Sequence, residues 1–288
     1  MNVPAGKVPI IESVQAAWRG ALKTAPMVAP AALVGALVMT AINFLSMRAG
    51  LSGNLIGQMA FSALSGLGVA LFFAPAILAN LGEDARLSPA TLTRGFKLYA
   101  AMAIIGFFLV IVVVVGALPG LVMIGMVFAP YQAELAAAQG DPAAAMALFQ
   151  KVFAEQTGPL LLIGLIYALI WIALTSRLYL TAPASVAEDR VASFETWRWT
   201  QGNLLRISAA RLLTLTPAAL VAALVQALVT SLFGLNTGDP GAVMAAVTAN
   251  PAAFVGASFI TTAASFIVYG ACEAALSAYL YRGLKPPA

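Results

Sequence analysis

The sequence contains no histidine and a single cysteine, Cys272, among its 288 residues. Without histidine the chain lacks the commonest general base and the commonest metal ligand, and a serine–histidine–aspartate triad is impossible. One cysteine excludes an internal disulfide and any metal site built from several cysteines. We therefore expect a protein that is not an enzyme and that carries no metal or other cofactor.

Charged residues are also scarce, at 9%, whereas hydrophobic residues make up 61% of the chain and the mean hydropathy is +0.94. Soluble domains carry about a quarter charged residues. The sequence therefore predicts an all-α polytopic membrane protein, with no water-soluble domain and no cleavable signal peptide. The net charge of +4 is not a nucleic-acid footprint, because no large aromatic and basic surface accompanies it.

Six apolar segments are long enough to cross a membrane, since a span needs roughly 20 apolar residues. An amphipathic segment is expected before each odd-numbered span: residues 10–23, a helix opening at Ser88-Pro89, and the aromatic and basic residues 194–203. Such segments lie in the membrane interface. The expected spans cover about 25–47, 55–80, 98–128, 159–181, 205–234 and 252–281.

The basic residues lie almost entirely on one side of these spans. Only Arg48 and Lys151 lie on the other side. The positive-inside rule then places both termini in the cytoplasm, in a bacterial inner membrane. The thirteen residues on the first side are Lys7, Arg19, Lys23, Arg86, Arg94, Lys97, Arg177, Arg190, Arg198, Arg206, Arg211, Arg282 and Lys285.

An internal repeat divides the chain into a single membrane domain of three helical hairpins, covering about 10–84, 88–189 and 191–285. Each hairpin is introduced by an interfacial segment, with AWRG, TRGF and WRWT in register around Arg19, Arg94 and Arg198. The first two hairpins end alike, in FAPAILANLGED and TAPASVAED. The third ends in YGACEAAL and keeps only an acidic residue. Spans two and four are expected to break at their Ala-Pro-Ala steps.

The stretch that carries Arg177, Pro183-Ala184, Glu188 and then WRWTQGN at 197–203 resembles a bacterial family. It is similar to the membrane domain of glycerophosphoryl diester phosphodiesterases and to related stand-alone polytopic proteins. The similarity is clearest over about 170–215. In that family the phosphodiesterase chemistry lies in a separate soluble barrel domain, and this chain has none. The resemblance implies a membrane module without the enzyme's activity.

Six residues are candidates for binding an anionic lipid headgroup, because arginine grips phosphate bidentately and tryptophan favours the interface. The alternative is an ordinary aromatic belt with a positive-inside charge. Glu273 and Arg211 are the intramembrane polar candidates, which either form a structural ion pair, also open to Arg177, or relay a proton or ion. The lipid candidates are Arg177, Trp197, Arg198, Trp199, Arg19 and Arg94.

The favoured hypothesis is a non-catalytic inner-membrane protein that binds anionic lipid and acts as an accessory or scaffold subunit beside other membrane proteins. The alternative is a small solute or lipid transporter or channel that uses Glu273 and kinks at Pro119 and Pro217. A membrane-embedded lipid enzyme would depend on Asp84 or Asp189, and acid–base groups for it are scarce.

Overall fold

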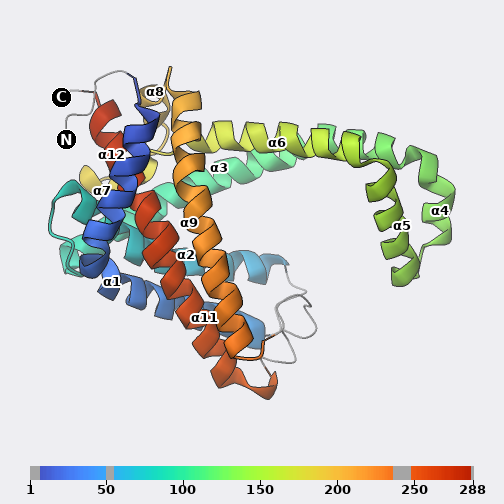
Figure 1. Cartoon of the computed structure of the whole chain (residues 1–288), viewed down its shortest axis with the longest axis horizontal. Coiled ribbons are helices and arrows are strands. Elements are labelled where there is room, and N and C mark those ends of the chain that lie inside the picture. Colours follow the sequence, from blue (N-terminus) through green and yellow to red (C-terminus); the bar gives the residue numbers. More distant parts are fainter. Residues whose placement is uncertain (1–6, 50–54, 236–247, 287–288) are drawn as a thin grey trace. The chain divides into compact units, whose positions relative to one another are not determined.

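The computed structural model describes residues 7–49, 55–235 and 248–286, and this part consists of helices joined by short turns and loops, without strands. Figure 1 labels most of its elements. In chain order they are α1 (Ile10–Arg48), α2 (Leu55–Leu81), α3 (Pro89–Phe128), η2 (Ala129–Tyr131), α4 (Gln132–Ala137), α5 (Pro142–Glu155), α6 (Thr157–Arg177), α7 (Thr181–Ala187), α8 (Thr196–Trp199), α9 (Leu204–Leu232), α11 (Pro251–Ser265), the π-helical turn η3 (Phe266–Gly270) and α12 (Ala271–Leu284).

Six helical segments of the described chain are long and apolar enough to cross a membrane, as predicted. Their mean hydropathy lies between 1.7 and 3.0 over the most apolar window. They are Ile10–Arg48, Gly57–Leu81, Pro89–Ala137, Thr157–Ala187, Leu204–Leu232 and Pro251–Leu284.

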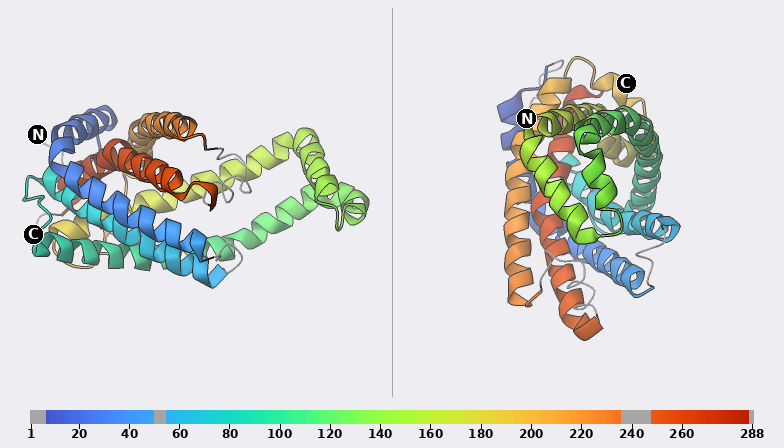
Figure 2. Two further views of the ribbon diagram at one scale, coloured as in Figure 1. Left: turned by 90° about the horizontal axis from the view of Figure 1, so that it is seen from below. Right: turned by 90° about the vertical axis from the view of Figure 1, so that its right-hand side faces the viewer.

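The first two interfacial segments are not separate helices, contrary to expectation. Residues 10–23 continue without a break into α1, and the helix that begins at Pro89 continues as α3. The first part of α1 (dark blue) and its remainder (lighter blue) nevertheless run in different directions in Figures 1 and 2. Pro26 and Pro30 lie inside α1 and account for the bend, because each removes a backbone hydrogen bond. The third segment is shorter than expected, a single turn, α8.

The Ala-Pro-Ala steps do not break the helices where the sequence suggested. Pro75 lies inside α2, which continues to Leu81. Between α6 and α7 the break falls at Leu178–Leu180, and Pro183 lies in the first turn of α7. A proline in the first turn costs no hydrogen bond, so it starts a helix as readily as it ends one.

Three helices begin at a capping residue followed by proline, as the sequence predicts for Ser88-Pro89, Asp141-Pro142 and Asn250-Pro251. The Ser88 hydroxyl accepts a hydrogen bond from the Thr91 N–H, the Asp141 carboxylate from Ala144, and the Asn250 carbonyl oxygen from Ala253. Each cap satisfies an N–H that the first turn leaves without a partner. Asp239-Pro240 lies outside the described residues.

The chain divides into two compact units. Unit 1 comprises Met1–Ile104 and Ser176–Ala288, and unit 2 comprises Ile105–Thr175. Unit 2 falls wholly within the predicted second hairpin. The division into three repeats stays a prediction.

The core of unit 1 joins the segments that the sequence aligned as hairpin ends. The end of α2, α7 and α12 pack against one another in pairs, and α1 packs most extensively on α2. Alanine dominates their shared cluster, which allows close approach of the backbones. Ala74 and Ile77 of α2, Val186 of α7, and Cys272 and Ala275 of α12 are buried there.

Two glycines set the distance between α1 and α2. A Cβ on Gly35 would lie 2.5 Å from the carbonyl oxygen of Gly68, and a Cβ on Gly68 would lie 2.6 Å from that of Gly35. Both obstacles are backbone atoms, which cannot move aside as a side chain can. These two positions therefore require glycine.

Unit 2 contains the rest of α3 and most of α6. The Tyr167 hydroxyl of α6 donates a hydrogen bond to the Gly116 carbonyl of α3. Gly120 leaves room for the ring, because a Cβ there would lie 2.5 Å from the same hydroxyl oxygen. Gly120 is thus a helix-packing position, whereas a Cβ on Gly116 would have no neighbour within 4 Å. Beyond these helices, α5 packs on α4 and η2 around the buried side chains of Tyr131, Leu148 and Val152.

Candidate functional site

The stretch between α6 and α9 contains most of the residues that the sequence singled out, and a dense set of hydrogen bonds fixes it. The buried Thr181 hydroxyl of α7 lies 3.1 Å from that of Thr196 in α8. The Thr200 hydroxyl donates to the carbonyl of Arg177 at the end of α6. Gly202 then turns the chain before α9 with a φ of +81°, a conformation that glycine adopts readily. The single turn of α8 is thereby held against the end of α6.

This geometry brings Arg177 against Trp197, and Arg198 follows Trp197 in α8. We call these three residues the arginine–tryptophan surface. The Arg177 guanidinium lies over the Trp197 ring, 5.7 Å from its centroid, within the range of a cation–π contact. Trp197 is 36% exposed and Arg198 is exposed beside it. Neither arginine forms an ion pair with a carboxylate among residues 7–49, 55–235 and 248–286.

The nearby carboxylates are bound by other cations. Arg190 forms ion pairs with Glu188 at 2.5 Å and with Glu195 at 2.7 Å. Lys97 of α3 forms a 2.9 Å ion pair with Asp189. Arg190 thus pairs with Glu195, the acidic residue closest to α8. The positive charge of the arginine–tryptophan surface is therefore not neutralised by a carboxylate of the described chain.

The pKa values of these acids agree with their pairing. Burial raises the pKa of Glu188, but hydrogen bonds from Arg190, Lys285 and Tyr281 outweigh it, and the net effect is a lowered pKa. The hydrogen bond from Lys97 lowers the pKa of Asp189. Both side chains are therefore ionised at neutral pH.

The other three lipid candidates are placed differently. Trp199 points into unit 1, where it packs near Tyr281 with the ring centroids 6.1 Å apart. Arg94 forms an ion pair with Glu83. Arg19 is exposed on α1. Of the six predicted residues, Trp197, Arg198 and Arg19 are thus exposed, Arg177 is half-buried, Arg94 is ion-paired and Trp199 packs inside unit 1.

Sequence reasoning missed one further basic group close to α8. The backbone N–H of Val8 donates to the Asn203 side chain at 3.0 Å, and Arg206 donates to the Val8 carbonyl at 3.1 Å. Lys7, which is exposed, is thereby placed next to the start of α9. Val8, an apolar residue between prolines, is the one feature of the sequence that could have signalled this contact. It did not indicate a partner nearly two hundred positions away.

The intramembrane candidates belong to a second polar group, which we call the Arg211 cluster. It comprises Ser176, Tyr179, Ser208, Arg211 and Glu273. Arg211 donates to the Ser176 hydroxyl at 2.9 Å and lies over the Tyr179 ring, 4.6 Å from its centroid. Ser208 also donates to Ser176, and Tyr179 donates to the backbone carbonyl of Glu273 at 3.3 Å.

The predicted ion pair of Glu273 is not formed with either arginine. Arg177 lies at Trp197, and in the described chain the Glu273 carboxylate has no hydrogen bond or ion pair, although the charge of Arg211 acts on it. The π-helical turn η3 ends three residues before Glu273. Such turns interrupt α-helices frequently at functional sites.

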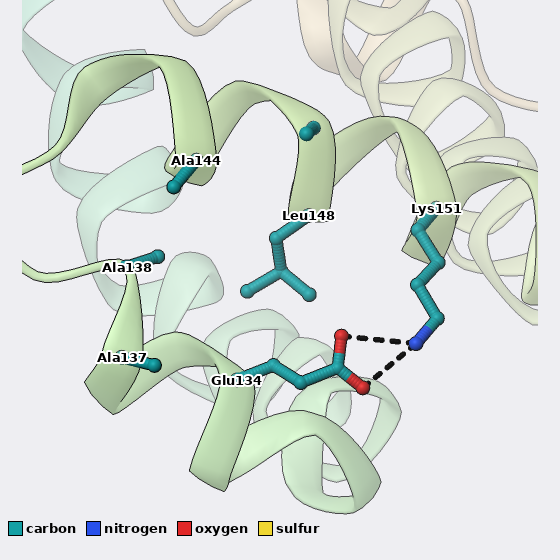
Figure 3. Close-up of a pocket in the computed structure, with 7 residues that line it drawn as sticks. Glu134, Ala137, Ala138, Ala144, Leu148 and Lys151 are labelled. Carbon is teal, nitrogen blue, oxygen red and sulfur yellow. Dashed lines mark hydrogen bonds and ion pairs between the residues drawn. The ribbon is translucent and has the colours of Figure 1, made fainter.

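Unit 2 contains a shallow pocket of about 380 Å³ between α4 and α5. Figure 3 shows Leu148 pointing into it, and Glu134 and Lys151 at one edge. Those two side chains form an ion pair at 2.7 Å, and the remaining lining residues are alanines. With its charges paired internally, the pocket presents no group that would select a ligand.

Within the described residues, no three of the cysteine and acidic side chains lie close enough together to hold a metal ion. No protein-family model, curated protein or solved structure matches the chain significantly. The resemblance to the phosphodiesterase membrane domain therefore stays a prediction.

Proposed function

We propose that this chain is a non-catalytic, multi-pass protein of a bacterial inner membrane that binds anionic lipid headgroups through the arginine–tryptophan surface. In this proposal both termini are cytoplasmic, the spans form three hairpins with interfacial segments before them, and the surface lies at the cytoplasmic edge of the membrane. The protein would act there as an accessory or scaffold subunit for other membrane proteins.

The observation that carries the proposal is the charge distribution around α8. Glu195 precedes Thr196, the first residue of α8, yet its carboxylate is bound by Arg190. Arg177 and Arg198 are left with their positive charge beside an exposed tryptophan. A phosphate group satisfies such a pair of guanidinium groups with charge-assisted hydrogen bonds, and the indole ring lies at headgroup level.

The test is the composition of phospholipid that copurifies with the full chain. Wild-type protein should retain anionic phospholipid in excess over zwitterionic phospholipid, relative to the membrane from which it is extracted. The double variant R177Q/R198Q should lose that excess. Arg48→Gln is the matched control, because Arg48 also lies over an aromatic ring, that of Phe44, on the opposite side of the first span. An equal excess in all three proteins would contradict the proposal.

A lipid headgroup and a free phosphate ion share the same chemistry at this site. Inorganic phosphate in the purification buffer separates the two sources. If the surface binds lipid, phosphate at millimolar concentration leaves the retained anionic lipid unchanged. Complete displacement by phosphate would show a soluble anion site instead.

A second candidate function is a small transporter or channel, which the position of Glu273 after a π-helical turn favours. Purified protein in liposomes would then move a solute, and Glu273→Gln would abolish the flux with the fold intact. Flux that survives this substitution would remove Glu273 from the pathway.

A further inference from the structure

Arg211 and Glu273 lie inside two helices that are long and apolar enough to cross a membrane. Arg211 is about 10 Å along α9 from Leu204, and Glu273 is about 16 Å from the end of α12 at Leu284, at roughly 1.5 Å per residue. Arg211 is therefore about two turns, and Glu273 about three turns, from the nearest end of its helix. An ionisable residue at such a depth is costly and is retained where it has a function.

The residues of the cluster come from the helices α6, α9 and α12 and from the break before α7. Ser176, at the end of α6, is fully buried, and its hydroxyl accepts hydrogen bonds from both Arg211 and Ser208 of α9. Tyr179, from the break before α7, is 8% exposed and bridges the guanidinium group of Arg211 and the backbone of Glu273. Arg211 is thus held in place by contacts that do not involve the Glu273 carboxylate.

The π-helical turn determines which side of the last span carries the carboxylate. Phe266 in this turn stacks on Phe72 of α2, with ring centroids 4.8 Å apart, and Gly270 lies against the same ring. A Cβ on Gly270 would lie 2.6 Å from Phe72. The wider turn therefore fixes Phe266 and Gly270 on α2, while Glu273 follows on the side of Arg211 and Tyr179.

Two opposing effects act on the Glu273 carboxyl group. The apolar surroundings penalise its ionised form, whereas the positive charge of Arg211 favours it. Arg211 is the one charged group of the described chain that acts on Glu273, and α1 and α2 present small and apolar residues to the last span. The other titratable neighbours are Tyr179, with Tyr269 and Cys272 on the same helix.

From this arrangement we infer that Glu273 is a proton-binding site within the membrane-spanning part of the chain, with Arg211 as its internal counter-charge. The carboxylate oxygen takes up one proton, and the cluster changes from net neutral to a single positive charge on Arg211. Arg211 keeps its contacts with Ser176 and Tyr179 in both states, so the charge can change without loss of packing. This inference does not depend on lipid binding at α8.

The test is labelling of the full chain in detergent with dicyclohexylcarbodiimide, which reacts with protonated carboxyl groups in apolar surroundings. The acid proton moves to a carbodiimide nitrogen while the carboxylate oxygen adds to the central carbon. Rearrangement leaves a stable acylurea that mass spectrometry locates. With labelling measured over a pH range from about 5 to about 9, we expect an adduct on Glu273 whose yield decreases as the pH rises, since the reactive form is the neutral acid.

Four variants define the result. Glu273→Gln should lose the adduct, whereas Glu195→Gln, which removes an exposed carboxylate, should retain it. Arg211→Gln should increase labelling about threefold or more near neutral pH, because the counter-charge is lost. Arg211→Lys keeps the charge and should label within about twofold of wild type.

The wild-type titration decides the inference even if the Arg211 variants do not fold. No adduct on Glu273 over this pH range would overturn it. So would an adduct whose yield does not depend on pH, or equal labelling of a folded Arg211→Gln variant.

Discussion

The Lys285 ammonium group lies 3.2 Å from the Glu188 carboxylate and thereby connects the end of α12 to the end of α7. The Tyr281 hydroxyl donates to the same carboxylate at 3.0 Å. One turn away, Arg282 donates to the carbonyl of Asn80 at 2.6 Å, at the end of α2. Basic side chains satisfy terminal helix carbonyls in this way. The last turn of α12 therefore holds the end of α7 and the end of α2 in place.

This contact predicts a loss of stability in acid. The folded-state pKa of Glu188 is below its ordinary value of 4.5, so its stabilising effect is present above that pH and is lost as the pH falls through the lowered pKa. At neutral pH, Glu188→Gln should lower the free energy of unfolding by about 1–3 kcal/mol, since its charged partners lose an acceptor. In thermal melts in detergent, the difference from wild type should shrink as the pH falls below 4.5 and through the lowered pKa of Glu188.

Glu195→Gln is the control for this prediction. Its side chain is 38% exposed and has one cationic partner, so its effect should be smaller. An equal loss in both variants, or a Glu188→Gln effect independent of pH, would contradict the fastening role of Glu188.

The close approach of α1 and α2 predicts that Gly35→Ala destabilises the protein by about 1–3 kcal/mol, because the new methyl group meets the Gly68 carbonyl. Gly106→Ala is the matched change, since a Cβ there has no neighbour within 4 Å. It should leave the melting temperature unchanged or raise it, as alanine has the higher helix propensity. Thermal melts of both variants in one detergent check this, and equal melting temperatures would contradict the packing.

The two tryptophans of α8 should behave differently. Trp199→Ala should cost about 2 kcal/mol or more, because its ring packs against Tyr281. Trp197→Ala should change stability by less than about 0.5 kcal/mol, because its ring lies on the surface. Melting curves measure the first effect, and retention of anionic lipid should be reduced in the second variant alone. If Trp197→Ala destabilised the protein more than Trp199→Ala, the assignment of Trp199 to the packed interior and Trp197 to the surface would be wrong.

The contact of Val8 with α9 predicts that Asn203 holds the start of the chain. Asn203→Ala leaves the buried Val8 N–H without its acceptor, at a cost of about 1–3 kcal/mol. Limited proteolysis should then cleave before α1 sooner than in wild type. Gln201→Ala, at an exposed position two residues earlier, should not change the cleavage rate.

Hydropathy and composition were sufficient to predict the helical class and the six spans, because twenty apolar residues in a row have few other structures available. Helix caps were predictable for the same local reason: Ser88, Asp141 and Asn250 bond to residues three positions later. Proline did not predict where a helix ends, because Pro75 lies inside α2 and Pro183 lies in the first turn of α7.

The candidate site was predictable only in outline. The sequence identified Arg177, Trp197 and Arg198 as candidates for lipid binding, and it identified Trp199 equally. Only the packing distinguishes the Trp197 ring, which contacts Arg177, from the Trp199 ring, which contacts Tyr281. Glu195 pairs with Arg190 and not with Arg198. This pairing depends on the turn at Asp189, whose φ is +48°. Long-range contacts such as Val8 with Arg206 leave no pattern in the sequence.

The central claim is that an anionic headgroup binds at Arg177 and Arg198, and titration of delipidated protein with phosphatidylglycerol, resolved by native mass spectrometry, tests it most directly. We predict that R177Q/R198Q weakens the first binding step about tenfold, equivalent to about 1.4 kcal/mol. Arg48→Gln should bind as wild type does, and phosphatidylcholine should show no difference between the proteins. Equal phosphatidylglycerol affinity in wild type and the double variant would contradict the account.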